Sequence, residues 1–221
     1  MPKPEDLKVI MERRPNWDLI QELPKELYGF TLREGGQLNV HEFMLASYVN
    51  EEWNRRLELV YTDETFDYLA IRQVGLHRYR DFRYITRDKD VFAQRMRESL
   101  DLLVKEITPD FLPRSSHILK GKGILDWTYP DTLPDRIGRF VKFIGPHYPL
   151  DFINNTTVIL DYVDFSVGDE LVFLYNRVRN EFYAEDKRHF IPNTIHDFDA
   201  KQLPDLEELI VEKLESYLLN M

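Results

Sequence analysis

Two stretches of this chain resemble each other at a nearly constant spacing, and this repeat constrains the fold more than any other feature. Residues 16–24 resemble residues 126–134, with Trp17 matching Trp127 at a shift of 110. From residue 47 onward the shift is 114, which sets the apolar run 57–61 on 171–175. A self-similarity of this length predicts an internal duplication. The change in shift predicts about four extra residues in the second copy, near the Gly and Pro residues of 145–149.

The same shift of 114 superimposes two amphipathic helices. Apolar residues in 89–107 recur at the spacing of one helix face, and so do those that follow Pro204. The matched positions are Phe92, Met96, Leu100, Leu103 and Ile107 in the first copy, and Leu206, Ile210, Leu214, Tyr217 and Met221 in the second. Amphipathic helices also align by chance, but here the strands and the Trp landmarks keep the same order. We therefore expect both copies to end in a buried helix.

Upstream of each helix, runs rich in β-branched and aromatic residues alternate with polar joints, which is typical of antiparallel strands. Strands followed by a helix favour an α+β class over an α/β class. We predict two tandem divergent repeats, each an antiparallel β-meander followed by a helix, related by a pseudo-twofold axis. The predicted organisation is an N-terminal helix in 1–15, a first repeat in 16–108, a linker in 109–125 and a second repeat in 126–221.

Composition excludes several classes of protein. The chain of 221 residues has a formal net charge of −10, which opposes binding to nucleic acid. It has no cysteine, so it has no disulfide and no thiolate site. No apolar run approaches the ~20 residues that span a bilayer, and the charged N-terminus does not resemble a signal peptide. We therefore expect a cytoplasmic protein that does not bind membranes.

The copies differ most between the last predicted strand and the helix. The first copy carries six basic residues in 72–89, against Asp81 and Asp88. Guanidinium groups beside aromatic rings can bind carboxylates or phosphates, and they can also stack on bases. The same pattern is typical of a strand whose arginines pair with surface acids. The residues predicted to contact a partner are Arg78, Tyr79, Arg80, Phe82 and Arg83.

The equivalent interval of the second copy, 186–203, contains the residue types that bind metal. These are His189, His196, Asp197 and Asp199. Two histidines separated by six residues match no known metal motif, and Pro192 interrupts the segment. We expect a polar loop that leads into the last helix, with no bound metal. The segment 186–203 remains the candidate site for an alternative metal- or His-dependent hydrolase.

No motif for a catalytic serine or a phosphate loop occurs in the chain. We therefore predict no catalytic residue and no cofactor. The function that the sequence favours is a noncatalytic binding module for an acidic protein, a small anion or another small ligand. Two alternatives stay open, the hydrolase described above and a binder of single-stranded nucleic acid. Trp17 and Trp127 are predicted to be core anchors. The sequence does not indicate the oligomeric state.

Overall fold

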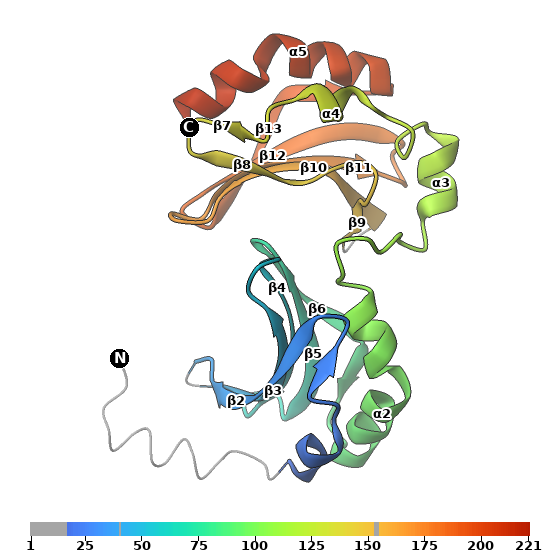
Figure 1. Ribbon diagram of the computed structural model, residues 1–221, viewed down its shortest axis with the longest axis vertical. Helices are drawn as coiled ribbons and strands as arrows, with labels where there is room; N and C mark the ends of the chain where they lie inside the picture. Colours follow the sequence, from blue (N-terminus) through green and yellow to red (C-terminus); the bar gives the residue numbers. More distant parts are fainter. Residues whose placement is uncertain (1–16, 40, 153–154) are drawn as a thin grey trace. The chain divides into compact units, whose positions relative to one another are not determined.

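A computed structural model of the chain describes residues 17–39, 41–152 and 155–221 (Figure 1). The chain divides after Pro109 into two units, each with an antiparallel sheet and helices. The fold is therefore of the mixed α+β class, as predicted. The predicted N-terminal helix of 1–15 lies outside the described residues. None of the described helices is long and apolar enough to cross a membrane.

The first unit begins with a short 3₁₀ helix, Asp18–Glu22, and contains a six-stranded sheet in sequential order from β1 to β6. Asp88 is the N-cap of helix α2 (Lys89–Lys105), and its carboxylate accepts hydrogen bonds from the backbone N–H groups of Asp90 and Val91. The elements are β1 (Glu26–Leu27), β2 (Phe30–Gln37), β3 (Glu42–Asn50), β4 (Arg55–Thr62), β5 (Asp67–Val74), β6 (His77–Thr86) and α2 (Lys89–Lys105).

Part of the core of the first unit lies between its sheet and α2, and a separate cluster forms around Val60, Leu69 and Ile71. Phe92 of α2 contacts two aromatic rings, with centroid distances of 5.5 Å to Trp17 and 5.7 Å to Tyr68. All five apolar positions of the predicted helix face are buried. Trp17 is only 5% exposed, which confirms its predicted place in the core.

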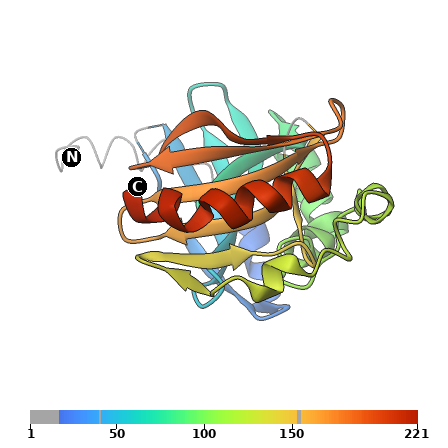
Figure 2. The same cartoon turned by 90° about the horizontal axis from the view of Figure 1, so that it is seen from above.

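The second unit has a seven-stranded sheet, and α5 lies over the strands of that sheet (Figure 2). Phe198 of β13 contacts Phe173 of β11 and Tyr217 of α5, at centroid distances of 5.0 and 5.6 Å. The elements are α3 (Ser116–Gly121), α4 (Tyr129–Thr132), β7 (Arg136–Ile137), β8 (Phe140–Ile144), β9 (Leu150–Asp151), β10 (Thr156–Asp164), β11 (Asp169–Asn176), β12 (Glu181–Arg188), β13 (Ile191–Ala200) and α5 (Leu203–Asn220).

Corresponding elements of the two units keep the spacing found in the sequence. Strands β3 to β6 begin at residues 42, 55, 67 and 77, and β10 to β13 begin at 156, 169, 181 and 191, which is 114 later in each case. Helix α5 also begins 114 residues after α2, whereas β7 and β8 begin 110 residues after β1 and β2. The spacing changes between β8 and β10, where the sequence predicted extra residues.

Irregularities of the sheets also coincide. The β3–β4 pairing shifts register between Met44 and Ala46, and the β10–β11 pairing shifts between Val158 and Leu160, again 114 residues later. In each unit a buried tyrosine donates a hydrogen bond to a proline carbonyl: Tyr48 to Pro24 at 2.6 Å and Tyr162 to Pro134 at 2.7 Å. The two predicted strands 57–61 and 171–175 are confirmed, since they lie within β4 and β11.

The expectation of a polar loop in 186–203 is wrong. Residues 191–200 form strand β13, which pairs with β12. Its buried side chains, Ile195, Phe198 and Ala200, do not alternate strictly because the pairing shifts register near residue 183. Pro192 is compatible with the strand because β13 is at the edge of the sheet. A strand with a proline and several acidic residues gives a poor strand signal in the sequence.

Apart from Pro109, the predicted linker 109–125 is part of the second unit. It contains α3, and Leu119 and Ile124 belong to the core beneath α5. Ser115 and Thr157 donate hydrogen bonds to the Asp151 carboxylate at 2.6 and 2.8 Å, and Arg177 pairs with the same group. These contacts attach α3 to the sheet.

Candidate binding surfaces

The arginine-rich segment of the first copy forms strand β6. Arg78 and Arg80 have exposed side chains, and each pairs with a carboxylate of its own unit. Arg78 donates to Glu58 of β4 at 2.9 Å, and Arg80 donates to Glu42 of β3 at the same distance. Phe82 is 73% exposed, whereas Tyr79 is half-buried and burial raises its pKa.

Arg83, whose side chain is partly exposed, joins three buried charged residues, Arg72, Asp81 and Glu106, in an ionic cluster that we call the Arg72 cluster. Arg83 donates to Asp81 at 2.7 Å and to Glu106 at 2.8 Å, and Arg72 pairs with the same two carboxylates. Burial opposes ionisation of Asp81 and Glu106, but the two guanidinium groups more than offset this effect and hold both pKa values below their usual range. The cluster therefore joins the end of α2 to strands β5 and β6.

The four candidate metal ligands of the second unit do not converge. His189 lies in the turn between β12 and β13, whereas His196 lies within β13. Five residues of extended strand separate His196 from Ile191 at the start of β13, which is roughly 16 Å at about 3.3 Å per residue. Their side chains are 79% and 80% exposed. His196 pairs with Asp199 at 2.8 Å, whereas Asp197 contacts Lys213 through its backbone carbonyl. Within the described residues, these four side chains form no common coordination site.

A groove of about 630 Å³ opens beside Trp127 in the second unit, and we call it the Trp127 groove. Two aromatic rings, Trp127 and Tyr129, lie on one side with centroids 6.4 Å apart. Three carboxylates line it, and none of its lining residues is a lysine, arginine or histidine. The lining residues are Gly123, Asp126, Trp127, Thr128, Tyr129, Thr132, Leu203, Pro204, Glu207 and Glu208.

Hydrogen bonds fix the wall of this groove. The indole Nε1–H of Trp127 donates to Glu207 at 2.7 Å, which connects the wall to the first turns of α5. The Lys142 ammonium donates to the carbonyls of Pro130 and Leu133 at 3.1 and 2.9 Å. Burial, together with the charge of Glu207, raises the pKa of Tyr129, so its phenol stays neutral at ordinary pH.

His147 makes polar contacts with residues next to those that line the groove. Its Nε2 lies 3.0 Å from an Asp131 oxygen, and its Nδ1 lies 3.2 Å from the Leu125 carbonyl. The hydrogen bond with Asp131 raises the pKa of His147 above its ordinary value. The wall is therefore built from a short helix and two loops that polar contacts hold in place.

The first unit has no acidic groups at the matching positions. Trp17 matches Trp127 and is equally buried, at 5% exposed. The positions of Tyr129, Glu207 and Glu208 correspond to Leu19, Ala93 and Gln94. Trp17 Nε1 has no hydrogen-bond partner among the described residues, because Ala93 offers no acceptor. Burying this tryptophan therefore does not require the carboxylate, and the acidic lining is particular to the second unit.

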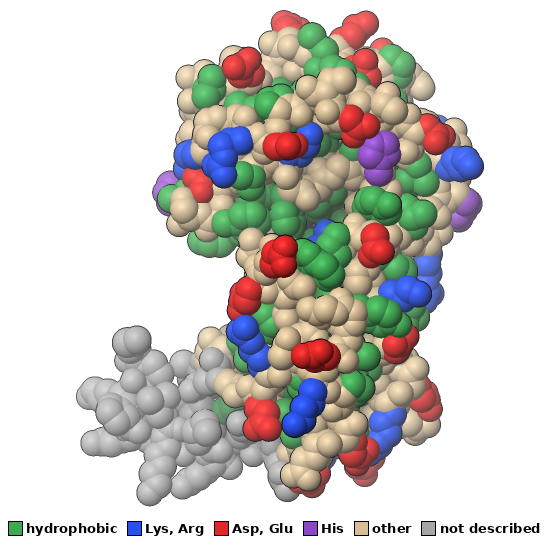
Figure 3. All heavy atoms as spheres, in the orientation of Figure 1, with side chains coloured by type: hydrophobic (Ala, Val, Ile, Leu, Met, Phe, Trp, Pro, Cys, Tyr) green, Lys and Arg blue, Asp and Glu red, His purple; other side chains and the backbone are tan. Residues whose placement is uncertain are grey.

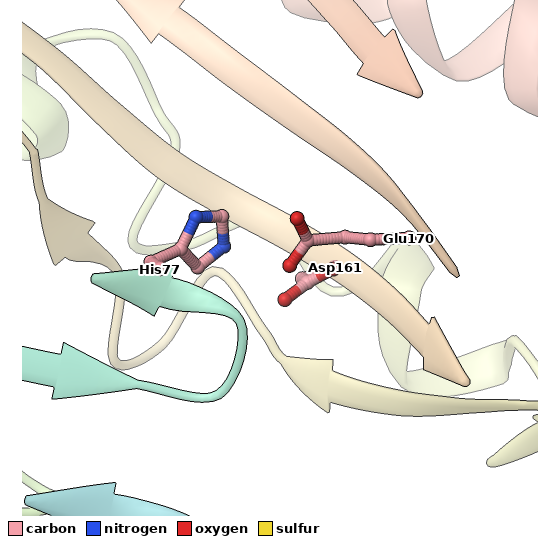
Figure 4. A group of neighbouring side chains, drawn as sticks. All are labelled: His77, Asp161 and Glu170. Carbon is pink, nitrogen blue, oxygen red and sulfur yellow. The ribbon is translucent and has the colours of Figure 1, made fainter. Parts of the chain in front are cut away.

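Two further carboxylates lie together on the sheet of the second unit. Asp161 of β10 and Glu170 of β11 are near each other in Figure 4, with a pair of carboxylate oxygens within 4.8 Å. Lys187 of β12 donates to Glu170 at 2.5 Å, which provides a positive counter-charge. This grouping could not be predicted from the sequence, because the pairing of three strands, β10, β11 and β12, brings the side chains together.

On the face drawn in Figure 3, acidic and basic side chains of the described residues are interspersed. No family model, no curated protein and no solved structure matches this chain. The candidate sites are therefore inferred from the geometry of this structure alone.

Proposed function

We propose that this protein is a noncatalytic binding module, and that the Trp127 groove binds a small ligand or side chain that carries a positive charge. The observation that supports this is the lining itself: two aromatic rings and three carboxylates, with no basic residue among them. Carboxylates attract a cation through charge, and aromatic rings attract it through their electron-rich faces. An ammonium or guanidinium group has the complementary chemistry.

We further propose that the two units arose by duplication and then diverged. The equal spacings of strands, helices and register shifts support a common ancestor. The copies share apolar core positions and differ at Glu207 and Glu208 and in β6 and β13. Because packing of the core does not require these polar side chains, we propose that they serve to recognise ligands or partners.

Isothermal titration calorimetry on the full chain tests the ligand class. Spermidine and tetramethylammonium serve as cationic probes, and succinate serves as the anionic control. We expect saturable binding of a cationic probe, at least about tenfold weaker in Glu207→Gln/Glu208→Gln because charge-assisted contacts are lost. Glu212→Gln/Glu215→Gln changes two acids of the same helix that do not line the groove. Equal weakening by both double variants would show that only the overall charge matters.

A further inference from the structure

Strand β6 is the edge of the first unit's sheet, and among the described residues its one strand partner is β5. A two-residue turn, Gly75 and Leu76, connects the two strands, and Val74 pairs with His77. In such hairpins the pair beside the turn exchanges hydrogen bonds, and the bonded and non-bonded pairs then alternate. Arg78 and Arg80 therefore direct their backbone N–H and C=O groups away from β5.

The second unit supports the conclusion that the backbone groups of Arg78 point away from β5. Pro192 of β13 is the counterpart of Arg78 and pairs with Lys187, just as Arg78 pairs with Gln73. A proline has no N–H, so it fits only where the strand makes no ladder bond. The proline also blocks the edge of β13 against a further strand. At the corresponding position of β6, Arg78 has a backbone N–H group that can donate a hydrogen bond to an added strand.

The two halves of β6 differ. In the second half, Arg95 of α2 donates to the carbonyls of Arg83 and Ile85 at 3.2 and 3.4 Å, which covers that part of the edge. In the first half, Arg78 and Arg80 have exposed side chains, and the exposed ring of Phe82 follows them. The first half of β6 thus combines outward backbone groups, two guanidinium groups and an apolar side chain.

The arginines can bind a second carboxylate in addition to the one they already contact. A guanidinium group has five N–H donors, and one carboxylate uses two of them at most. Arginines elsewhere in this chain bridge two acids: Arg83 bridges Asp81 and Glu106, and Arg139 bridges Asp164 and Asp169. Arg80 contacts Glu42 through one nitrogen, and its side chain is 54% exposed.

We propose that the segment 78–82 of β6 binds an extended acidic segment of a partner protein, which adds to the sheet as a further strand. Backbone hydrogen bonds to Arg78 and Arg80 hold the added strand. Acidic side chains of the partner pair with the guanidinium groups, and an apolar side chain packs on Phe82. This surface belongs to the first unit, and it is independent of the Trp127 groove.

The test uses the full chain and an acetylated peptide of alternating glutamate and valine. We expect saturable binding that slows hydrogen exchange at the amides of Arg78 and Arg80. Arg78→Ala/Arg80→Ala should weaken binding at least about tenfold, whereas Arg179→Ala, an exposed arginine of the second unit, should not. Arg80→Ala alone serves if the double variant unfolds, because Arg78 balances the buried Glu58.

Two further probes separate strand addition from simple charge attraction. A peptide with N-methylated backbone amides keeps its charge but cannot form the ladder, so it should not bind. Equal binding of that peptide, absence of binding by the first peptide, or tighter binding of oligo(dT) at the same residues would each overturn the proposal.

Discussion

At the scale of single residues, the arginines of β6 divide into two kinds. Arg83 pairs with the buried carboxylates of Asp81 and Glu106, and Arg78 pairs with the buried carboxylate of Glu58. Arg80 is the most exposed of the three, and it pairs with the partly exposed Glu42. Buried charges that lose a partner are costly, but exposed pairs contribute little. A variant of all three β6 arginines would thus mix an effect on the fold with an effect on recognition.

We predict that Arg72→Ala lowers the free energy of unfolding by about 3–5 kcal/mol, because it removes the buried one of the two guanidinium groups that balance Asp81 and Glu106 and leaves both carboxylates to the more exposed Arg83. Arg80→Ala should lower it by less than about 1 kcal/mol. Urea denaturation of the two variants and the wild-type chain measures both quantities. Similar losses from both substitutions would show that the Arg72 cluster does not hold α2 on its sheet.

His147 gives a prediction that depends on pH. Because pairing with Asp131 raises its pKa on folding, the protonated ring stabilises the native state. This stabilisation is fully present below the unfolded pKa of about 6.5, and it is lost as pH rises through the folded value. We expect His147→Gln to cost more stability at pH 5.5 than at pH 9, by less than about 1 kcal/mol. Thermal unfolding at both pH values measures this difference, and Asp131→Asn should remove it.

At the scale of elements, the two buried tyrosines make an internal comparison. Tyr48 and Tyr162 each connect a central strand to the segment before the first hairpin of its unit. Burial raises the pKa of Tyr48 to about 12 and raises that of Tyr162 as well, so both hydroxyls remain donors. Their equivalence follows from the pairing of Tyr48 with Leu57 and of Tyr162 with Leu171.

We predict that Tyr48→Phe and Tyr162→Phe each lower the free energy of unfolding by about 1 kcal/mol, since each removes one buried hydrogen bond. Chemical denaturation of the two single variants measures both values. A loss confined to one variant would mean that the two hydrogen bonds do not play the same structural part.

The sequence predicted these elements unevenly. Strands β4 and β11 and both long helices were evident because their apolar residues follow one period throughout. Strand β13 was missed because Pro192 and its acidic residues lower strand propensity, which sheet pairing overrides. The Trp127 groove could not be predicted, since it joins the segment before α4 to the start of α5, eighty residues further along the chain. Of the residues that line the groove, the sequence analysis singled out only Trp127, and it predicted a place for it in the core.

At the scale of the whole molecule, two units with the same order and spacing of strands carry different surfaces. The common positions are core side chains and backbone geometry, which any copy must keep to fold. The differing positions give the first unit an arginine-bearing edge strand and the second an acidic groove. We propose that duplication followed by such divergence gave one chain recognition sites for ligands of opposite charge, and this is our central claim for its function.

The most direct measurement is a nuclear magnetic resonance titration of the full chain, with observation of its indole N–H signals. The chain has three tryptophans, and the Trp127 indole donates to Glu207 at the groove. Trp127→Phe assigns its signal, and spermidine is the probe. We predict a saturable shift of the Trp127 signal while those of Trp17 and Trp53 stay in place. Equal small shifts of all three signals, or no shift of Trp127, would contradict a cation-binding groove.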